Sequence, residues 1–333
     1  MYTSRLVKFV LLLFIFLLSL ITYNQYSRYS LTSIQPISSC SFNDIAACQM
    51  NSNRNRTFLY ISWNRAGFCS EFNQLLLAFA YSIFTKRYFL IDSRLWNYGR
   101  LSDYFDIPFN NNYPSINRTF LSDNSRINDQ IAHLKTTRIG TQVRRFWIAT
   151  QPVHSIMLKR PAAHYLWRTM SNETRKFIER YRVGNISNSI GIHIRKGDKI
   201  GKEAREIPLK KYIKSIERLF KKDRRLQQIF VASDDRTVIN KLRRLKPIWH
   251  FVSIHDNNND TSNRTGHFQF TFNLLPRKQK LIETRLLLTE LQMLIDSKFV
   301  VCGMSSNVCR LIQTLRYQHP STVISLDHSW RAT

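Results

Sequence analysis

Acidic residues are scarce in this chain. It contains 22 Asp and Glu against 50 Lys and Arg, which gives a formal net charge of +28 over 333 residues. Such an excess attracts anions, so it favours nucleic acid, acidic membranes or phosphorylated small molecules as partners. Glycine and proline are also few, at nine each, and 43% of the residues are hydrophobic. This composition is typical of a globular protein with one large domain or two.

Several familiar sequence motifs are missing. There is no DxD sequence, so the commonest metal-bridged diphosphate site is absent, and there is no GxSxG, HExxH or Walker A sequence. The cysteines show no CxxC spacing and no zinc-type Cys/His spacing. They are Cys40, Cys48, Cys69, Cys302 and Cys309. We therefore predict no metal site, and an odd count leaves one cysteine over in an oxidising compartment.

The longest hydrophobic run lies near the N-terminus. Residues 9–23, FVLLLFIFLLSLITY, carry no charge, and Arg5 and Lys8 precede them. With the two residues before it, the run approaches the roughly 20 residues that span a bilayer. The positive-inside rule then places residues 1–8 in the cytosol and the rest of the chain in a lumen, as for a signal-anchor. A cleaved signal peptide is the alternative, although no convincing cleavage site follows the run.

Both interpretations send the body of the protein into the secretory pathway. Asn-x-Ser/Thr sequons agree with this as supporting evidence. They stand at Asn55, Asn117, Asn172, Asn185, Asn259 and Asn263. Because a secreted protein does not normally meet nucleic acid, a phosphorylated substrate is the leading explanation of the positive charge. Residues 24–54, rich in Ser, Asn, Gln and Tyr, are interpreted as a luminal stem.

Residues 55–185 are interpreted as an N-terminal α/β half. FLYISW predicts a strand, LLLAFAYSIF a helix and YFLID a second strand. In the loop WNRAGFCSEFNQ, Gly67 either lets the backbone approach phosphates or forms an ordinary turn. Residues 95–140 stay unassigned, and helices are predicted at about 140–158 and 160–182.

Residues 186–333 show a clearer alternation of strands and helices. Strands are predicted at 189–194, 227–233, 250–254, 298–302 and 322–326. Helices are predicted at 209–219, 236–245, 279–295 and 306–317. This alternation predicts a mostly parallel sheet covered on both faces, whose ligands bind beyond the carboxyl ends of the strands.

The first of these strands runs into a basic heptapeptide. Its sequence is His193-Ile194-Arg195-Lys196-Gly197-Asp198-Lys199. Arg clamps a phosphate with two parallel N–H bonds and Lys supplies a mobile point charge, so a sugar-nucleotide diphosphate matches both. Fixed cations here would also stabilise the negative charge that builds on a leaving nucleotide. A solvated basic turn closed by Asp198 is the alternative.

Carboxylates stand at further edges of the predicted sheet. The second strand ends at Ser233-Asp234-Asp235, and the helix before the fourth strand carries Glu290. Such groups could accept hydrogen bonds from ribose hydroxyls or from the N–H groups of guanine. They could equally cap helices, because Asp is a favoured N-cap and a helix is predicted from Arg236.

The fourth strand ends in the sequence CGMSSNVCR. Here Ser305, Ser306 and Asn307 open a predicted helix, whose free backbone N–H groups make an anion site as readily as a simple cap. Cys302 and Cys309, seven positions apart across this turn, could form a disulfide.

In combination these segments resemble the α1,6-fucosyltransferase family, which includes the animal core fucosyltransferases and the rhizobial chito-oligosaccharide fucosyltransferases. The resemblance lies in HIRKGDKIGKEA, PLKKYI, FVASDD and FVVCGMSSNVCR, in that order. It extends more loosely to WNRAGFCSEFNQ and LIDSRLWNY, and it covers roughly residues 57–320.

The resemblance implies a Golgi enzyme that transfers fucose from GDP-fucose to a GlcNAc-containing glycan, with inversion and without a metal. It implies a GT-B-like α/β fold with a Rossmann-like C-terminal half, preceded by the transmembrane helix. Arg195 would hold the diphosphate, Lys199 would stabilise the leaving charge, and Glu203 would be the general base. His193 and Glu290 would lie near the guanine. The remaining donor-site positions are Gly67, Lys196, Asp198, Tyr212, Asp234, Asp235, Ser305, Ser306 and Asn307.

The chain departs from the family pattern in three places. Lys196 stands where the family has a second arginine, Glu290 where it has Asp, and Asn307 where it has Gln. The SH3-like domain and the long helical stem of the animal core enzymes are not matched, so neither core N-glycan specificity nor dimerisation is carried over. Two alternatives stay open, namely a protein O-fucosyltransferase and a catalytically silent, membrane-tethered protein that binds GDP or a glycan.

One basic segment has no place in this scheme. Residues 209–226, LKKYIKSIERLFKKDRRL, could attract anionic lipid or acidic glycan. We interpret them here as a solvated, charged helix face.

Overall fold

The computed structural model divides the chain into two compact units, Met1–Asn43 and Asp44–Thr333. The residues that the structure describes lie in the second unit. They are 45, 53–61, 66–94, 96–107, 129–131, 159–184, 186–198, 200, 206–256, 266–316 and 319–327. Within these ranges, no helix is both long and apolar enough to cross a bilayer. The predicted membrane segment, residues 9–23, lies outside them.

The first half of the described unit is built on a three-stranded parallel sheet. Its strands are β1 (Asn53–Ile61), β2 (Arg87–Asp92) and β3 (Asp129–Ile131), in the order β2-β1-β3. The helix α3 (Phe68–Phe84) connects β1 to β2, as the sequence pattern predicts for a β-loop-α-β unit.

The helix α3 begins earlier than predicted, inside the segment that was assigned to a loop. Phe68 and Phe72 are buried one helical turn apart and their rings stack at 5.6 Å, so the apolar face of the helix extends to its first residue. The polar side chain of Glu71 is itself buried and accepts a hydrogen bond from the Ala66 N–H at 2.9 Å.

The segment 96–107 packs its aromatic side chains on the start of α3. The ring of Phe68 lies 5.5 Å from that of Trp96 and 5.4 Å from that of Tyr98. A short 3₁₀ helix, η2 (Leu101–Asp103), follows these aromatic residues. Because buried aromatic rings have few rotatable bonds, this cluster fixes the loop firmly against the helix.

Two helices precede the second sheet, α6 (Arg160–Arg168) and α7 (Asn172–Tyr181). The sequence predicts one helix over 160–182, but the structure breaks it because Ser171 caps α7 by accepting the Thr174 N–H. The other helix predicted nearby, at 140–158, lies outside the described residues.

The second half is built on a five-stranded parallel sheet in the order β6-β5-β4-β7-β8. The strands are β4 (Ser189–Ile194), β5 (Gln228–Ser233), β6 (Phe251–Val252), β7 (Phe299–Cys302) and β8 (Val323–Ser325). All five agree with predicted strands, although β6 and β8 are shorter than predicted. β4 is buried along its whole length, which accounts for its continuous apolar pattern.

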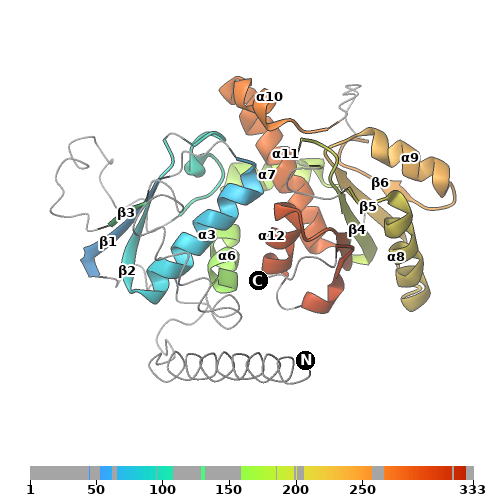
Figure 1. Ribbon diagram of the computed structural model, residues 1–333, viewed down its shortest axis with the longest axis horizontal. Helices are drawn as coiled ribbons and strands as arrows, with labels where there is room; N and C mark the ends of the chain where they lie inside the picture. Colours follow the sequence, from blue (N-terminus) through green and yellow to red (C-terminus); the bar gives the residue numbers. More distant parts are fainter. Residues whose placement is uncertain are drawn as a thin grey trace, which may run out of the picture. The chain divides into compact units, whose positions relative to one another are not determined.

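Helices cover both faces of this sheet. Figure 1 shows α8 (Leu209–Lys222) and α9 (Thr237–Leu245) on one side, and α11 (Arg277–Asp296) and α12 (Asn307–Leu315) on the other. The core between the sheet and α8–α9 includes Ile192, Ile216 and Val231, each 2% exposed or less. α12 contacts α3 and α6, so the two halves are packed together through helices.

A short helix, α10 (Gln269–Leu274), was not predicted. Its sequence, QFTFNL, carries two aromatic residues in six positions and shows no helical periodicity long enough to recognise. Tertiary contacts hold it: Asn273 accepts from Asn97 at 2.6 Å, and Gln269 Oε1 lies 3.2 Å from the Tyr98 hydroxyl.

Candidate functional site

A cavity of about 510 Å³ lies where the carboxyl ends of β4, β5 and β7 meet α10, α11 and the start of α3. Its wall includes residues of both halves of the described unit. Eight of the predicted site residues line it: Gly67, His193, Arg195, Asp234, Glu290, Ser305, Ser306 and Asn307. A cavity of this volume accommodates a small-molecule ligand.

Arg195 stands at the centre of a network of carboxylates. Its Nη1 lies 3.0 Å from Asp234 Oδ2, and its Nη2 lies 3.0 Å from Asp198 Oδ1. The Asp234 carboxylate also accepts the backbone N–H groups of Lys196 and Gly197, both at 2.7 Å. These bonds orient the guanidinium and hold the basic loop after β4 in one shape.

The same loop is held from the other side by the segment that leads into α10. The Asp198 N–H donates to the His267 carbonyl at 3.3 Å, and the Gln269 N–H donates to Asp198 Oδ2 at 2.8 Å. A side chain at Gly197 would collide with the His267 backbone, so only glycine permits this close approach. The basic loop is therefore enclosed rather than a solvated turn.

The wall of the cavity contains three buried polar atoms that have no hydrogen-bond partner among the residues that the structure describes. They are His193 Nδ1, His255 Nδ1 and Glu290 Oε1. His255 Nε2 approaches Glu290 Oε1 at 3.7 Å, which is longer than a hydrogen bond. Because an unsatisfied buried polar atom is costly, three of them in the wall of one cavity indicate that a polar ligand completes their bonding.

Burial also shifts the pKa of two of these side chains, Glu290 and His193. It raises the pKa of Glu290, against the opposing influence of His255. It lowers the pKa of His193, against the opposing charge of Asp234. Both shifts favour the neutral side chains when the cavity has no ligand, because a low-dielectric environment penalises charge.

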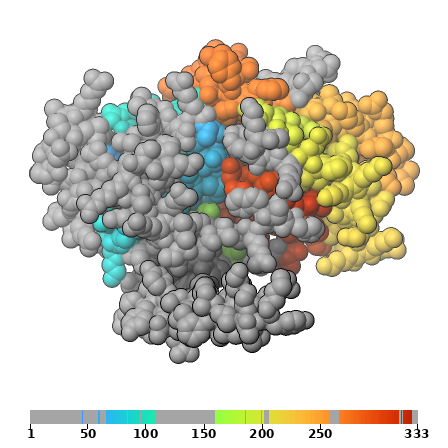
Figure 2. Space-filling view, viewed as in Figure 1, coloured from blue at the N-terminus to red at the C-terminus, as the bar shows by residue number. Residues whose placement is uncertain are grey.

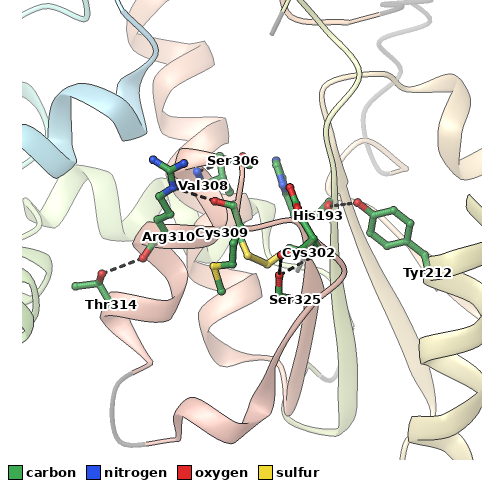
Figure 3. Close-up of a disulfide and its surroundings, with 11 residues drawn as sticks. His193, Tyr212, Cys302, Ser306, Val308, Cys309, Arg310, Thr314 and Ser325 are labelled. Atoms are coloured by element: carbon green, nitrogen blue, oxygen red, sulfur yellow. Dashed lines mark hydrogen bonds between the residues drawn. A yellow bond between two sulfur atoms is a disulfide. The ribbon is translucent and has the colours of Figure 1, made fainter. Parts of the chain in front are cut away.

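The start of α12 forms another part of the wall. Ser306 caps the helix by accepting the Val308 N–H at 3.3 Å. The Arg310 guanidinium donates to the Met304 carbonyl at 2.9 Å and to Asn307 Oδ1 at 3.2 Å. Figure 3 shows Arg310 beside Ser306, with the predicted Cys302–Cys309 disulfide formed directly below the turn. A helix start held in this way presents free N–H groups to an anion.

One known protein family matches the half of the chain that carries most of the cavity residues. The family model of the α-(1,6)-fucosyltransferase N- and catalytic domains matches residues 161–328. The chain belongs to this fucosyltransferase family. It is accordingly a glycosyltransferase, an enzyme of the fucosyltransferase class, and the cavity at its strand ends is the candidate active site.

Several solved fucosyltransferase structures are similar to this chain at low sequence identity. NodZ α-1,6-fucosyltransferase soaked with GDP-fucose is 16% identical over 82% of this chain and 96% of its own, with a TM-score of 0.46. Arabidopsis thaliana FUT1 with GDP is 13% identical over 84% and 74%, with a TM-score of 0.44. POFUT1 with GDP-fucose is 9% identical over 83% and 98%, with a TM-score of 0.47. Since these TM-scores lie below 0.5, the family assignment rests on the matched residues 161–328.

Four predicted donor-site residues of the fucosyltransferase do not line the cavity. Asp198 supports Arg195, and Lys196 forms an ion pair with Glu206 on its outer side. The Tyr212 hydroxyl donates to the His193 carbonyl at 3.1 Å, from a fully buried position behind the site. Asp235 caps α9 by accepting the Thr237 N–H at 2.9 Å. Of the two roles expected for this residue, ligand contact or helix cap, its contacts fit the cap.

Of the three residues predicted to carry the chemistry, Arg195 lines the cavity and the other two lie outside the described residues. These are Lys199 and Glu203. The structure describes Arg195 and Asp198 just before them and Glu206 just after. The roles of Lys199 and Glu203 therefore stay predictions from the sequence.

Several cavity residues were not identified from the sequence. His255, His267 and Gln269 lie between the predicted strand 250–254 and the predicted helix 279–295, and Tyr98 lies in the unassigned region 95–140. The Tyr98 hydroxyl lies 3.2 Å from Gln269 Oε1, a contact between residues 171 positions apart. The two histidines were a weak indication of a functional site, but nothing in the sequence associated them with Glu290.

Proposed function

We propose that this protein transfers L-fucose from GDP-fucose to a glycan acceptor that contains GlcNAc, in an α1,6-type linkage, with inversion and without a metal. The observation that carries the proposal is the presence, in one cavity, of an oriented arginine and of buried polar atoms without partners. Arg195 suits a diphosphate, and the unpartnered Glu290 and His193 suit a nucleobase.

The donor would lie along the wall of the cavity. Its diphosphate would bind to the Arg195 guanidinium and to the backbone N–H groups at the start of α12, where Ser306 and Asn307 stand. The carboxylate of Glu290 would accept the two adjacent N–H groups of guanine. Binding of guanine would thus supply the hydrogen bonds that Glu290 Oε1 lacks.

The chemistry would depend on cations and one carboxylate. Glu203 would take the proton from the acceptor hydroxyl as that oxygen attacks the anomeric carbon of fucose. GDP would leave from the opposite face, and Arg195 and Lys199 would stabilise the charge that develops on its phosphate. The support for Glu203 and Lys199 is the family resemblance of the sequence around them.

The setting of the enzyme is part of the same proposal. Residues 9–23 would be a signal-anchor that holds the protein in the Golgi membrane with the catalytic part in the lumen. The uncharged run with Arg5 and Lys8 on its N-terminal flank supports this topology. Glycosylation at Asn172 or Asn263 in cells, sensitive to a glycosidase only after the vesicles are opened, would test it.

The decisive experiment measures transfer of labelled fucose from GDP-fucose by the full chain in the presence of EDTA. The acceptors are N-glycans, chito-oligosaccharides and folded peptides, and GDP affinity is measured in parallel. Arg195→Ala should lower GDP affinity about 10- to 100-fold, because a charge-assisted contact is worth roughly 1.5–3 kcal/mol. Glu203→Gln should keep GDP affinity and lose transfer.

A matched control is Arg225→Ala, which removes an exposed arginine that pairs with Asp223 outside the cavity. It should change neither quantity. Transfer to folded peptides instead of glycans would favour a protein O-fucosyltransferase. GDP binding without transfer to any acceptor would favour a silent binding protein, and no GDP binding at all would refute the proposed site.

A further inference from the structure

The short helix α10 lies between the basic loop after β4 and the first half of the described unit. Figure 2 shows this helix, in orange, at the molecular surface next to α3, in blue. The ring of Phe272, inside the helix, lies 4.9 Å from the ring of Tyr98 in the first half. Because six residues make a marginal helix on their own, contacts with other segments decide where α10 sits.

On one side, α10 holds the basic loop through Asp198. The Gln269 N–H, at the first residue of the helix, donates to Asp198 Oδ2 at 2.8 Å. Asp198 Oδ1 lies 3.0 Å from Arg195 Nη2. The two oxygens of one carboxylate thus join α10 to the guanidinium, so a displacement of Gln269 would disturb one of the carboxylates that orient Arg195.

On the other side, the loop 96–98 of the first half holds α10. The Asn97 side-chain amide donates to Asn273 Oδ1 at 2.6 Å, and the same oxygen accepts the Gln269 side-chain amide at 2.9 Å. Asn97 is itself held from α11, because Lys280 Nζ donates to Asn97 Oδ1 at 3.2 Å. A continuous series of hydrogen bonds and one ion pair therefore runs from Asn97 to Arg195.

The two ends of this series differ in their relation to the cavity. Arg195 and Gln269 line it, whereas Asn97 and Asn273 are not among the described residues that do. An effect of Asn97 or Asn273 on a bound ligand would therefore pass through α10 rather than through a contact of their own.

We propose that Asn97 and Asn273 are positioning residues for the donor. Through Gln269 and Asp198 they fix where the Arg195 guanidinium meets the diphosphate. The first half of the described unit thereby contributes to the affinity for a donor whose diphosphate the second half binds. This inference rests on the proposed function, because it concerns the same donor site.

The test is titration calorimetry of GDP binding to the full chain, as a double-mutant cycle with Arg195→Ala. Asn97→Ala removes one neutral hydrogen bond and should lower GDP affinity by about fivefold. Asn273→Ala removes both bonds that its oxygen accepts and should lower the affinity further, on the order of tenfold. When combined with Arg195→Ala, either change should cost less than about twofold more, because the contact that it positions is already gone.

The matched control is Gln292→Ala, which removes another side-chain amide that bonds to a distant segment. Gln292 Oε1 of α11 accepts the Trp167 indole N–H of α6 at 2.8 Å, and Gln292 is not among the described residues that line the cavity. Thermal unfolding should show a loss of stability similar to that of Asn97→Ala. GDP affinity should stay within about twofold of the wild type.

The outcomes separate this inference from the proposed function. Unchanged GDP affinity in Asn97→Ala and Asn273→Ala, with a loss in Arg195→Ala, would overturn the inference and leave the donor site standing. Full additivity with Arg195→Ala would also overturn it, since α10 would then act on the ligand by another route. So would an equal loss of affinity in Gln292→Ala, which would indicate general destabilisation. No GDP binding by the wild type would instead refute the proposed function itself.

Discussion

The Asp234 carboxylate binds both the Arg195 guanidinium and the backbone N–H groups of the basic loop after β4. Its Oδ2 lies 3.0 Å from Arg195 Nη1, while the carboxylate also accepts the N–H groups of Lys196 and Gly197 at 2.7 Å. The side chain of one residue, directly after β5, thereby determines where the guanidinium points and what shape the loop after β4 takes. The neighbouring carboxylate, Asp235, does neither, because it caps α9.

Asp234→Asn should therefore weaken GDP binding about 10- to 100-fold, because the amide loses the charge and one acceptor of the network. Asp235→Asn is the matched control, since it lies one residue away and does not line the cavity. It should lower the stability of the fold and leave GDP affinity nearly unchanged. Titration calorimetry measures the affinity, and equal losses in the two variants would contradict this division of roles.

Glu290 should make GDP binding depend on pH. Burial raises its pKa above 4.5, so at low pH the empty cavity holds a protonated carboxyl that cannot accept both guanine N–H groups. Affinity should rise with pH through this raised pKa and then level off. Nearby, His255 and Arg236 oppose the shift and Asp234 reinforces it. Glu290→Gln should bind GDP more weakly and lose this dependence, and an unchanged pH profile would refute the assignment.

The buried Glu71 should make folding stability fall as pH rises. Burial raises its pKa from 4.5 to about 8, although hydrogen bonds from Trp96 and Ala66 oppose the shift. Between these values the folded protein retains a proton that the unfolded chain has released, so stability decreases with pH by on the order of 4 kcal/mol. Glu71→Gln should lack this slope. Urea denaturation at several pH values measures it, and parallel curves for both proteins would disprove the prediction.

The Cys302–Cys309 disulfide should stabilise the turn that starts α12. It closes a loop with a sequence separation of seven. The chain-entropy model gives about 2.5 kcal/mol for a loop of this size. Cys302→Ser/Cys309→Ser should lower the free energy of unfolding by about that amount and weaken GDP binding, because the turn carries Ser306. Cys69→Ser changes a buried cysteine outside any disulfide and leaves the turn intact; because Cys69 lines the cavity, this variant is a control for stability and not for GDP affinity.

Much of the fold could be predicted from the sequence, because long helices and strands have a periodic pattern of apolar residues. The buried strand β4 is apolar at Ile190, Ile192 and Ile194, and a segment rich in charged residues separates it from α8. Short elements are not long enough to show such a pattern. The six residues of α10 are helical because Asn273 and Gln269 bond to residues of other segments, and no local pattern records those bonds.

The sequence by itself determined the parallel α/β architecture and the collection of polar residues at the strand ends, because alternation of strands and helices brings those ends to one edge. Only the tertiary structure decided which of these residues act together. Asp234 and Asp235 are chemically identical neighbours, yet one turns to Arg195 and the other to Thr237. Likewise His255, in the turn after β6, lies 3.7 Å from Glu290 of α11, and such contacts between distant segments depend on three-dimensional packing that spacing along the chain does not encode.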